Sequence, residues 1–146
     1  MNKESLYCQL LTDMGLMLEG ETDPVARMAE AAALIYERTG FFWVGFYRVV
    51  NDVLVLGPFQ GPPACLRIAR GKGVCGTAWQ KASTIVVPDV EEFPGHIACS
   101  SLSRSEIVVP VIRDGEVMAV LDIDSTDVGT FTEEDAAWLE RIVSII

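Results

Sequence analysis

Residues 105–125 read SEIVVPVIRDGEVMAVLDIDS, and they determine the fold class. Two runs rich in β-branched residues lie on either side of Asp114-Gly115, a dipeptide that favours a tight turn between antiparallel strands. The segment therefore predicts a β-hairpin, and with it an antiparallel sheet that the rest of the chain extends and covers.

A second hairpin is predicted at residues 41–59, FFWVGFYRVVNDVLVLGPF, where aromatic and β-branched runs flank an Asn-Asp pair at 51–52. Because side chains alternate along a strand, Trp43 and Tyr47 share one face, and Phe42 would lie on the opposite face. The bulky pair Trp43 and Tyr47 is typical of a buried core, and it would also suit one wall of a pocket.

Apolar residues recur at helical spacing in three segments, at residues 5–18, 22–40 and 131–146. The last of these helices opens with Thr132 and Asp135, which can form a capping box. In the first helix, Cys8 is interpreted as a small, half-buried residue.

The helix predicted at 22–40 has clear end signals, because Thr22 or Asp23 can cap its start and Gly40 suits its exit. Its expected apolar face consists of Val25, Met28, Ala29, Ala32, Ile35 and Tyr36. Such a face indicates a helix that packs against the sheet.

The middle of the chain carries weaker signals. Residues 61–82, GPPACLRIARGKGVCGTAWQKA, predict loops with a short helix near 77–82, and the GKGVCG within them lacks the spacing of a phosphate-binding loop. A short strand is predicted at 83–90, and a long loop follows it. Together with the hairpins and helices, this order predicts the α+β class and one domain over residues 1–146.

Composition excludes several classes of function. The chain has 146 residues, 21 acids against 11 basic residues, and a formal net charge of -10, which disfavours nucleic-acid binding. No apolar run approaches the length of about 18 residues that a membrane span needs, and the start has no secretory pattern. We therefore expect a cytoplasmic protein whose thiols are kept reduced.

Two acids stand where a strand is normally apolar. Asp122 and Asp124 share one face of their strand and follow apolar residues on that face, a pattern typical of a pocket rim. A two-residue turn at Asp114-Gly115 would send Glu106 to the other face, whereas a three-residue turn would set it opposite Asp122. Three acids on one face would need a ligand amino group, a metal or a bound proton between them.

The cysteines allow three kinds of chemistry. Cys65, Cys75, His96 and Cys99 could form a zinc set, but only His96 and Cys99 are closely spaced, so we predict no metal site. A nucleophilic cysteine with His96 as its base is a second option. In the third, a loop thiol at Cys99 acts as a nucleophile and a second thiol resolves it as a disulfide.

Four motifs carry a resemblance to a known family. GKGVCGTA, VPDV followed by FPGHIACS, SEIVVPVI and AVLDIDS occur in this order from about residue 41 onward. They resemble the free methionine-(R)-sulfoxide reductases, which are built on a single GAF domain. The resemblance implies a GAF-like antiparallel sheet with the N- and C-terminal helices packed on one face, and a homodimer.

The resemblance also implies roles for individual residues. Cys99 would attack the sulfoxide sulfur and become a sulfenic acid, and a disulfide with a resolving cysteine would follow. Cys65 matches the main resolving position and Cys75 the third family cysteine. The substrate-site residues that match the family are Glu106, Asp122, Asp124, Trp43 and Tyr47. No bound cofactor is implied, and thioredoxin, which is itself kept reduced with electrons from NADPH, would be the external reductant.

Two positions depart from the family pattern. Ser100 stands where members carry Asp after the nucleophile, and Trp79 is larger than the small residue expected there. Two other functions remain compatible with the residues: a non-catalytic GAF sensor of small molecules, and a thiol redox sensor that needs no carboxylate pocket.

Overall fold

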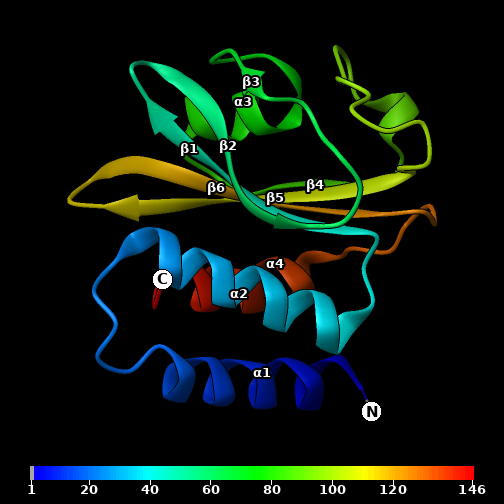
Figure 1. The fold of residues 1–146 in the computed structure, drawn as a ribbon. Coiled ribbons are helices and arrows are strands. Elements are labelled where there is room, and N and C mark those ends of the chain that lie inside the picture. Colours follow the sequence, from blue (N-terminus) through cyan, green and yellow to red (C-terminus); the bar gives the residue numbers. More distant parts are fainter. Residues whose placement is uncertain (1) are drawn as a thin grey trace.

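The computed structural model describes residues 2–146, which form one six-stranded antiparallel sheet and the helices around it (Figure 1). The strands occur across the sheet in the order β3-β2-β1-β6-β5-β4. Their bounds are β1 Trp43–Val50, β2 Val53–Gln60, β3 Arg67–Ile68, β4 Ile85–Val87, β5 Ser105–Arg113 and β6 Glu116–Ser125. The helices are α1 Lys3–Met17, α2 Pro24–Thr39, α3 Gly73–Lys81, the short 3-10 helix η1 Val90–Glu92 and α4 Glu133–Val143.

The sheet separates two layers. Figure 1 shows α1, α2 and α4 below the sheet, with α1 outermost, whereas α3 and the long loops lie above it. This arrangement confirms the predicted α+β class, with the N- and C-terminal helices on one face of an antiparallel sheet. Among residues 2–146, no helix is both long and apolar enough to cross a membrane.

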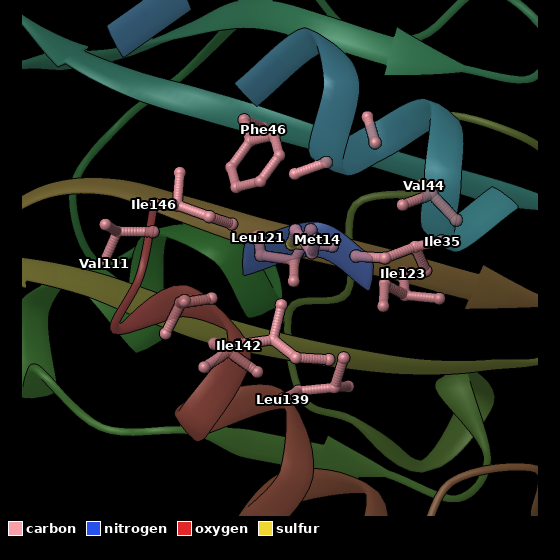
Figure 2. Packing of buried hydrophobic residues seen from close by; sticks show 14 of the residues in the cluster. Met14, Ile35, Val44, Phe46, Val111, Leu121, Ile123, Leu139, Ile142 and Ile146 are labelled. Carbon is pink, nitrogen blue, oxygen red and sulfur yellow. The ribbon is translucent and has the colours of Figure 1, made fainter. Parts of the chain in front are cut away.

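The larger hydrophobic core lies between the sheet and these three helices (Figure 2). Val44 and Phe46 of β1 point into it beside Leu121 and Ile123 of β6. Met14, Ile35, Leu139 and Ile142 close it from the helices. Each such side chain contributes about 1.5–3 kcal/mol through burial, so this face holds the sheet in place.

The turn and the helix caps that the sequence predicted are present in the structure. Asn51 and Asp52 both adopt positive φ angles, 49° and 61°, and join β1 to β2 in the two-residue turn that suits a hairpin. Asp23 caps α2 by accepting from two backbone amides, and Gly40 ends it with a φ of 71°. The capping box between Thr132 and Asp135 starts α4.

The β5–β6 register differs from both alternatives drawn from the sequence. The turn has two residues, because Arg113 pairs with Glu116, but a bulge follows at Met118, between the pairs Ile112–Val117 and Val111–Ala119. Because of this extra residue, the side chains of β6 beyond the bulge point to the opposite face from the one that a regular two-residue hairpin would give them. Glu106 therefore pairs with Asp124, and it shares a face with the acids despite the two-residue turn.

The expected apolar face of α2 is partly wrong. Val25, Ala29 and Tyr36 are exposed. The buried residues of this helix are Met28, Ala31, Ala32, Leu34 and Ile35. Helix α2 packs against α1 as well as against the sheet, so the buried side of the helix also includes Ala31 and Leu34.

Three further predictions need correction. Cys8 is exposed, not half-buried, because it lies on the side of α1 that faces away from the molecule. The middle segment contains the two-residue strand β3, whose apolar signal is too short to detect. Helix α3 begins at Gly73, before the expected helix near residues 77–82. The sequence did not reveal this first turn because it contains two glycines, which disfavour helix.

Candidate active site

The face of the sheet opposite the three helices carries the acids. Asp122 and Asp124 of β6 point to it, and Glu106 reaches it from β5 through the bulged register. On the other side of β6, Gly45 pairs with Asp122, and Trp43 pairs with Asp124. The central strands thus place three carboxyl groups and an indole ring around one spot.

Trp43 reaches this spot because Gly45 has no side chain. A Cβ atom at Gly45 would lie 2.5 Å from the Trp43 ring and 2.4 Å from Cβ of Phe59. Trp43 stacks on Phe59 and on Tyr47, with ring centroids 5.2 and 6.0 Å apart. The glycine between the two aromatic residues therefore lets the indole fold across the strand.

A cavity of about 40 Å³ lies over this part of the sheet. Five parts of the chain line it: β1, the loop before β3 together with Ile68 of β3, the start of α3, the loop before β5, and the β5–β6 pair. All the sequence-predicted site residues except Cys65 line it, namely Trp43, Tyr47, Cys75, Cys99, Glu106, Asp122 and Asp124. Cys65 adjoins it through Cys99.

Burial gives the acids unusual proton affinities. Glu106 and Asp122 are each only 6% exposed. Burial and the neighbouring Asp124 raise the pKa of Glu106 from 4.5 to about 8. Burial and Glu106 likewise raise the pKa of Asp122, and burial and Asp122 raise that of the partly exposed Asp124. Glu106 therefore holds a proton near neutral pH, and a cation that enters the cavity would favour the charged form of all three acids.

One oxygen among these acids has no partner. Oδ1 of Asp122 is buried, and no group in residues 2–146 forms a hydrogen bond to it. An unpaired buried acceptor costs about 1–3 kcal/mol, and a ligand that donates to it recovers this energy. The cavity is thus suited to a donor, and a cationic donor would also favour the charged form of the acids.

His96 reaches the acids from the long loop. Its Nε2 lies 3.6 Å from Oε1 of Glu106, and burial lowers the pKa of His96 below its ordinary value. With the raised pKa of Glu106, both groups are uncharged near neutral pH. No spacing in the sequence assigned His96 to this acid, although His96 is the only histidine of the chain and lies three residues before Cys99.

The cysteines fall into a bonded pair and a buried thiol. Cys65 and Cys99 form a disulfide with a Cα–Cα distance of 5.5 Å, across 34 positions of sequence. Cys75 is a free thiol in the first turn of α3, and burial together with Asp122 raises its pKa. Cys75 is therefore a thiol and a poor nucleophile, whereas the sulfur of Cys99 is held in the disulfide.

The structure brings together a different group of candidate metal ligands from the one considered in the sequence. Cys75, Glu106 and Asp122 place ligand atoms within 4.8 Å of one another, the one such group found among residues 2–146. The Cys65, Cys75, His96 and Cys99 set is not assembled, because two of its sulfurs are bonded to each other. The donor atoms of the cavity therefore belong mainly to carboxyl groups.

Aromatic side chains also hold the loop that carries Cys65. Nε1 of Trp43 donates to the carbonyl of Pro62 at 3.0 Å, and the Tyr47 hydroxyl donates to the carbonyl of Cys65 at 2.9 Å. Both residues are buried and line the cavity, so they serve as core and as pocket wall at once. The two interpretations of this pair are compatible.

Some cavity residues were missed or misplaced by sequence reasoning. Phe42 lines the cavity rather than the opposite face, because it precedes β1 and the strand alternation does not reach it. Lys72 lines the cavity just before α3, where only the glycine-rich motif hinted at a site. Of the two family departures, Ser100 accepts from the Leu102 amide, and Trp79 is buried under Arg70.

Comparison with known proteins extends over the whole length of the chain. A model described as a GAF domain matches residues 22–146. GAF domain-containing protein A of Dictyostelium discoideum is 51% identical, over 99% of this chain and 92% of its own length. Free methionine-R-sulfoxide reductase of Escherichia coli is 48% identical, over 99% of this chain and 88% of its own length. The X-ray structure of free methionine-R-sulfoxide reductase from Neisseria meningitidis, in complex with its substrate, has a TM-score of 0.97 and 52% identity, over 99% of this chain and 88% of that chain.

Proposed function

This chain belongs to the free methionine-R-sulfoxide reductase family of GAF-domain proteins, and we propose that it reduces free methionine-(R)-sulfoxide to methionine. One observation carries the proposal above all. Cys99, bonded to Cys65, lines the same cavity as three buried or half-buried carboxyl groups, and one oxygen of Asp122 among them has no hydrogen-bond partner within residues 2–146. A redox-active thiol and a binding site for an ammonium group thus meet in one place.

Selection of the free amino acid follows from the acids. Free methionine sulfoxide carries an α-ammonium group, which a peptide-bound residue lacks. The unpaired oxygen of Asp122 accepts from this group, and Glu106 or Asp124 gives up a proton to balance the charge. A blocked amino group would leave the buried oxygen unpaired, so the site discriminates against peptides.

Trp43 supplies the apolar wall. The substrate methyl group needs a surface that excludes water, and the buried indole of Trp43 offers a flat one over Gly45. The wall and the acids together orient the sulfoxide sulfur toward Cys99, which defines the stereochemical preference for one enantiomer.

The first chemical step transfers oxygen. The Cys99 sulfur attacks the sulfoxide sulfur, and the sulfoxide oxygen gains negative charge as the bond forms. A protonated Glu106 or Asp124 donates to this oxygen, a role that their raised pKa values support. The hydroxyl then passes from the substrate sulfur to Cys99 as the transient sulfur–sulfur bond breaks. Methionine leaves reduced by two electrons, Cys99 is left as a sulfenic acid, and the former thiol proton of Cys99 returns to the carboxyl group.

The second step resolves the sulfenic acid. The Cys65 thiol attacks Cys99, the sulfur–sulfur bond forms, and the hydroxyl leaves as water with the thiol proton. Cys75 is the third thiol and can relay the bond. A thioredoxin-type dithiol, maintained by NADPH, then reduces the disulfide, and no bound cofactor is needed. In this account residues 1–146 act as one GAF unit in the cytoplasm and assemble as a homodimer.

The experiment that tests the proposal is a chiral separation of free methionine-R,S-sulfoxide after incubation with the protein and dithiothreitol. We expect loss of the R form alone, and no loss with Cys99→Ser. If folded, reduced protein consumes neither form, the proposal is wrong, and a ligand-binding GAF sensor becomes the better account.

A further inference from the structure

We propose that Tyr47 is a positioning residue for disulfide formation: its hydroxyl holds the loop at residues 61–66 so that Cys65 stays within reach of oxidised Cys99. The inference rests on the proposed function, in which Cys65 resolves the sulfenic acid of Cys99. It gives Tyr47 a task beyond lining the substrate cavity.

The loop at residues 61–66 has few anchors of its own. Pro62 and Pro63 have no backbone N–H, and Gly61 adopts a φ of 131° that favours glycine. Between Gly61 and Leu66, the main-chain bond that holds the loop to the sheet runs from the Leu56 amide to the Leu66 carbonyl. The rest of the loop depends on side chains that reach it from elsewhere.

Two residues of β1 supply those side-chain bonds. Trp43 donates to the Pro62 carbonyl at 3.0 Å, and Tyr47 donates to the Cys65 carbonyl at 2.9 Å. Strand β1 is paired on both sides, with β2 and β6, so both donors start from a rigid part of the sheet. The Tyr47 bond is the more direct, because its acceptor belongs to the reacting cysteine itself.

The Tyr47 hydroxyl is a dependable donor. Its side chain is buried, stacked against Trp43, and burial raises its pKa, so the phenol stays protonated over the whole working range of pH. Its one donor proton is already used by the Cys65 carbonyl. We therefore assign the ring of Tyr47 to the cavity wall and its hydroxyl to the loop.

The reacting cysteines both depend on such positioning. Neither Cys65 nor Cys99 belongs to a helix or strand, and both lie in partly exposed loops. When sulfoxide reduction leaves Cys99 as a sulfenic acid, Cys65 must meet it before water or another thiol does. Holding two groups together raises their effective concentration, so the loss of one tether slows the resolving step in particular.

The test compares Tyr47→Phe with Tyr7→Phe. Each change removes one buried hydroxyl and keeps the ring, but Tyr7 donates to Asp135 between α1 and α4, away from the cavity. Pre-reduced protein reacts with excess methionine-R-sulfoxide without reductant, and aliquots are quenched with dimedone. Mass spectrometry then gives the fraction of Cys99 trapped as sulfenic acid and the fraction bonded to Cys65.

The measured quantity is the rate of disulfide formation from oxidised Cys99, which does not depend on the rate of the first step. For Tyr47→Phe we expect this rate to fall about three- to tenfold, as one lost hydrogen bond implies, with more dimedone adduct. Tyr7→Phe should match the unmodified protein. Equal rates for Tyr47→Phe and the unmodified protein would overturn the inference.

A second variant covers the case in which Tyr47→Phe does not fold. A Cβ atom at Gly61 would lie 2.7 Å from Cδ1 of Trp43, so Gly61→Ala displaces the exposed loop and leaves Tyr47 intact. The same slow resolution is expected, and an unchanged rate counts against the inference. If the unmodified protein releases no methionine at all, the proposed function fails instead, and the two failures are distinguishable.

Discussion

Glu106 combines three features that suit an acid catalyst. It is buried, it pairs with Asp124 across the hairpin, and its pKa is raised to about 8, so it carries a proton at neutral pH. Nε2 of His96 lies 3.6 Å from Oε1 of this carboxyl group, outside hydrogen-bond distance. In the proposed reaction, the surroundings of this carboxyl group keep it uncharged until a cation or a developing oxyanion approaches.

Glu106→Gln keeps the shape of this side chain and removes its proton exchange. We expect kcat/KM for methionine-R-sulfoxide to fall about 10²–10⁴-fold, the usual worth of general-acid catalysis. Glu116→Gln makes the same substitution at an exposed position at the start of β6, and it should leave the rate unchanged. Oxidation of the thiols by hydrogen peroxide should proceed in both variants, and a rate near normal for Glu106→Gln would remove this residue from the mechanism.

The same carboxyl group makes stability depend on pH. Because the pKa of Glu106 is 4.5 ordinarily and about 8 in the fold, the folded state binds more protons than the unfolded state between these values. The free energy of unfolding should therefore fall as pH rises from about 5 to about 8.5, with Asp122 and Asp124 acting in the same direction.

Urea unfolding of the disulfide-bonded protein at a series of pH values measures this slope. Glu106→Gln should flatten it by an amount on the order of a few kcal/mol across the window. An equally steep slope in the variant would mean that Glu106 ionises normally in the folded protein.

Helix α3 shows how an element supports the site. It carries Cys75 in its first turn, and its next residue, Gly76, lies against the chain at residues 69–71. A Cβ atom at Gly76 would lie 2.4 Å from the carbonyl oxygen of Ala69, which is backbone and cannot rotate away. The glycine is therefore a requirement of close packing between α3 and the preceding loop.

Gly76→Ala should accordingly destabilise the protein by about 1–3 kcal/mol, the usual cost of overpacking. Gly15→Ala is the matched control, because Gly15 lies in α1 and a Cβ atom there meets nothing within 4 Å. The control should gain roughly 0.5–1 kcal/mol from helix propensity. Thermal unfolding of both variants checks the opposite signs, and equal shifts would refute the packing argument.

Elements with strong local signals could be predicted from the sequence. The hairpin turn at 51–52, the cap at Asp23 and the capping box of α4 depend on residues a few positions apart, and all are present. The bulge at Met118 could not be predicted, because it depends on which faces of β5 and β6 are buried. The three acids do share a face, as the sequence allowed, but the bulge brings this about and not the three-residue turn that the prediction assumed.

In the molecule as a whole, one face of the sheet packs the larger core and the other carries the candidate active site. Helices α1, α2 and α4 lie below the sheet in Figure 1, and the large apolar core is buried between them and its lower face. The opposite face carries the cavity, the acids and the loops with Cys65 and Cys99. The sequence alone left the cysteine pairing open, because 34 positions separate the two residues and no local pattern links them. Only the resemblance pointed to it.

In the proposed mechanism one reaction joins these parts: methionine release from the sulfoxide oxidises Cys99, and Cys65 then closes the disulfide. The most direct measurement is a single turnover of pre-reduced protein with excess methionine-R-sulfoxide and no reductant, followed by methionine quantification and non-reducing peptide mapping. We predict one methionine per chain and a Cys65–Cys99 disulfide in equal amount. Absence of methionine, or methionine released while Cys99 remains a free thiol, would contradict the account.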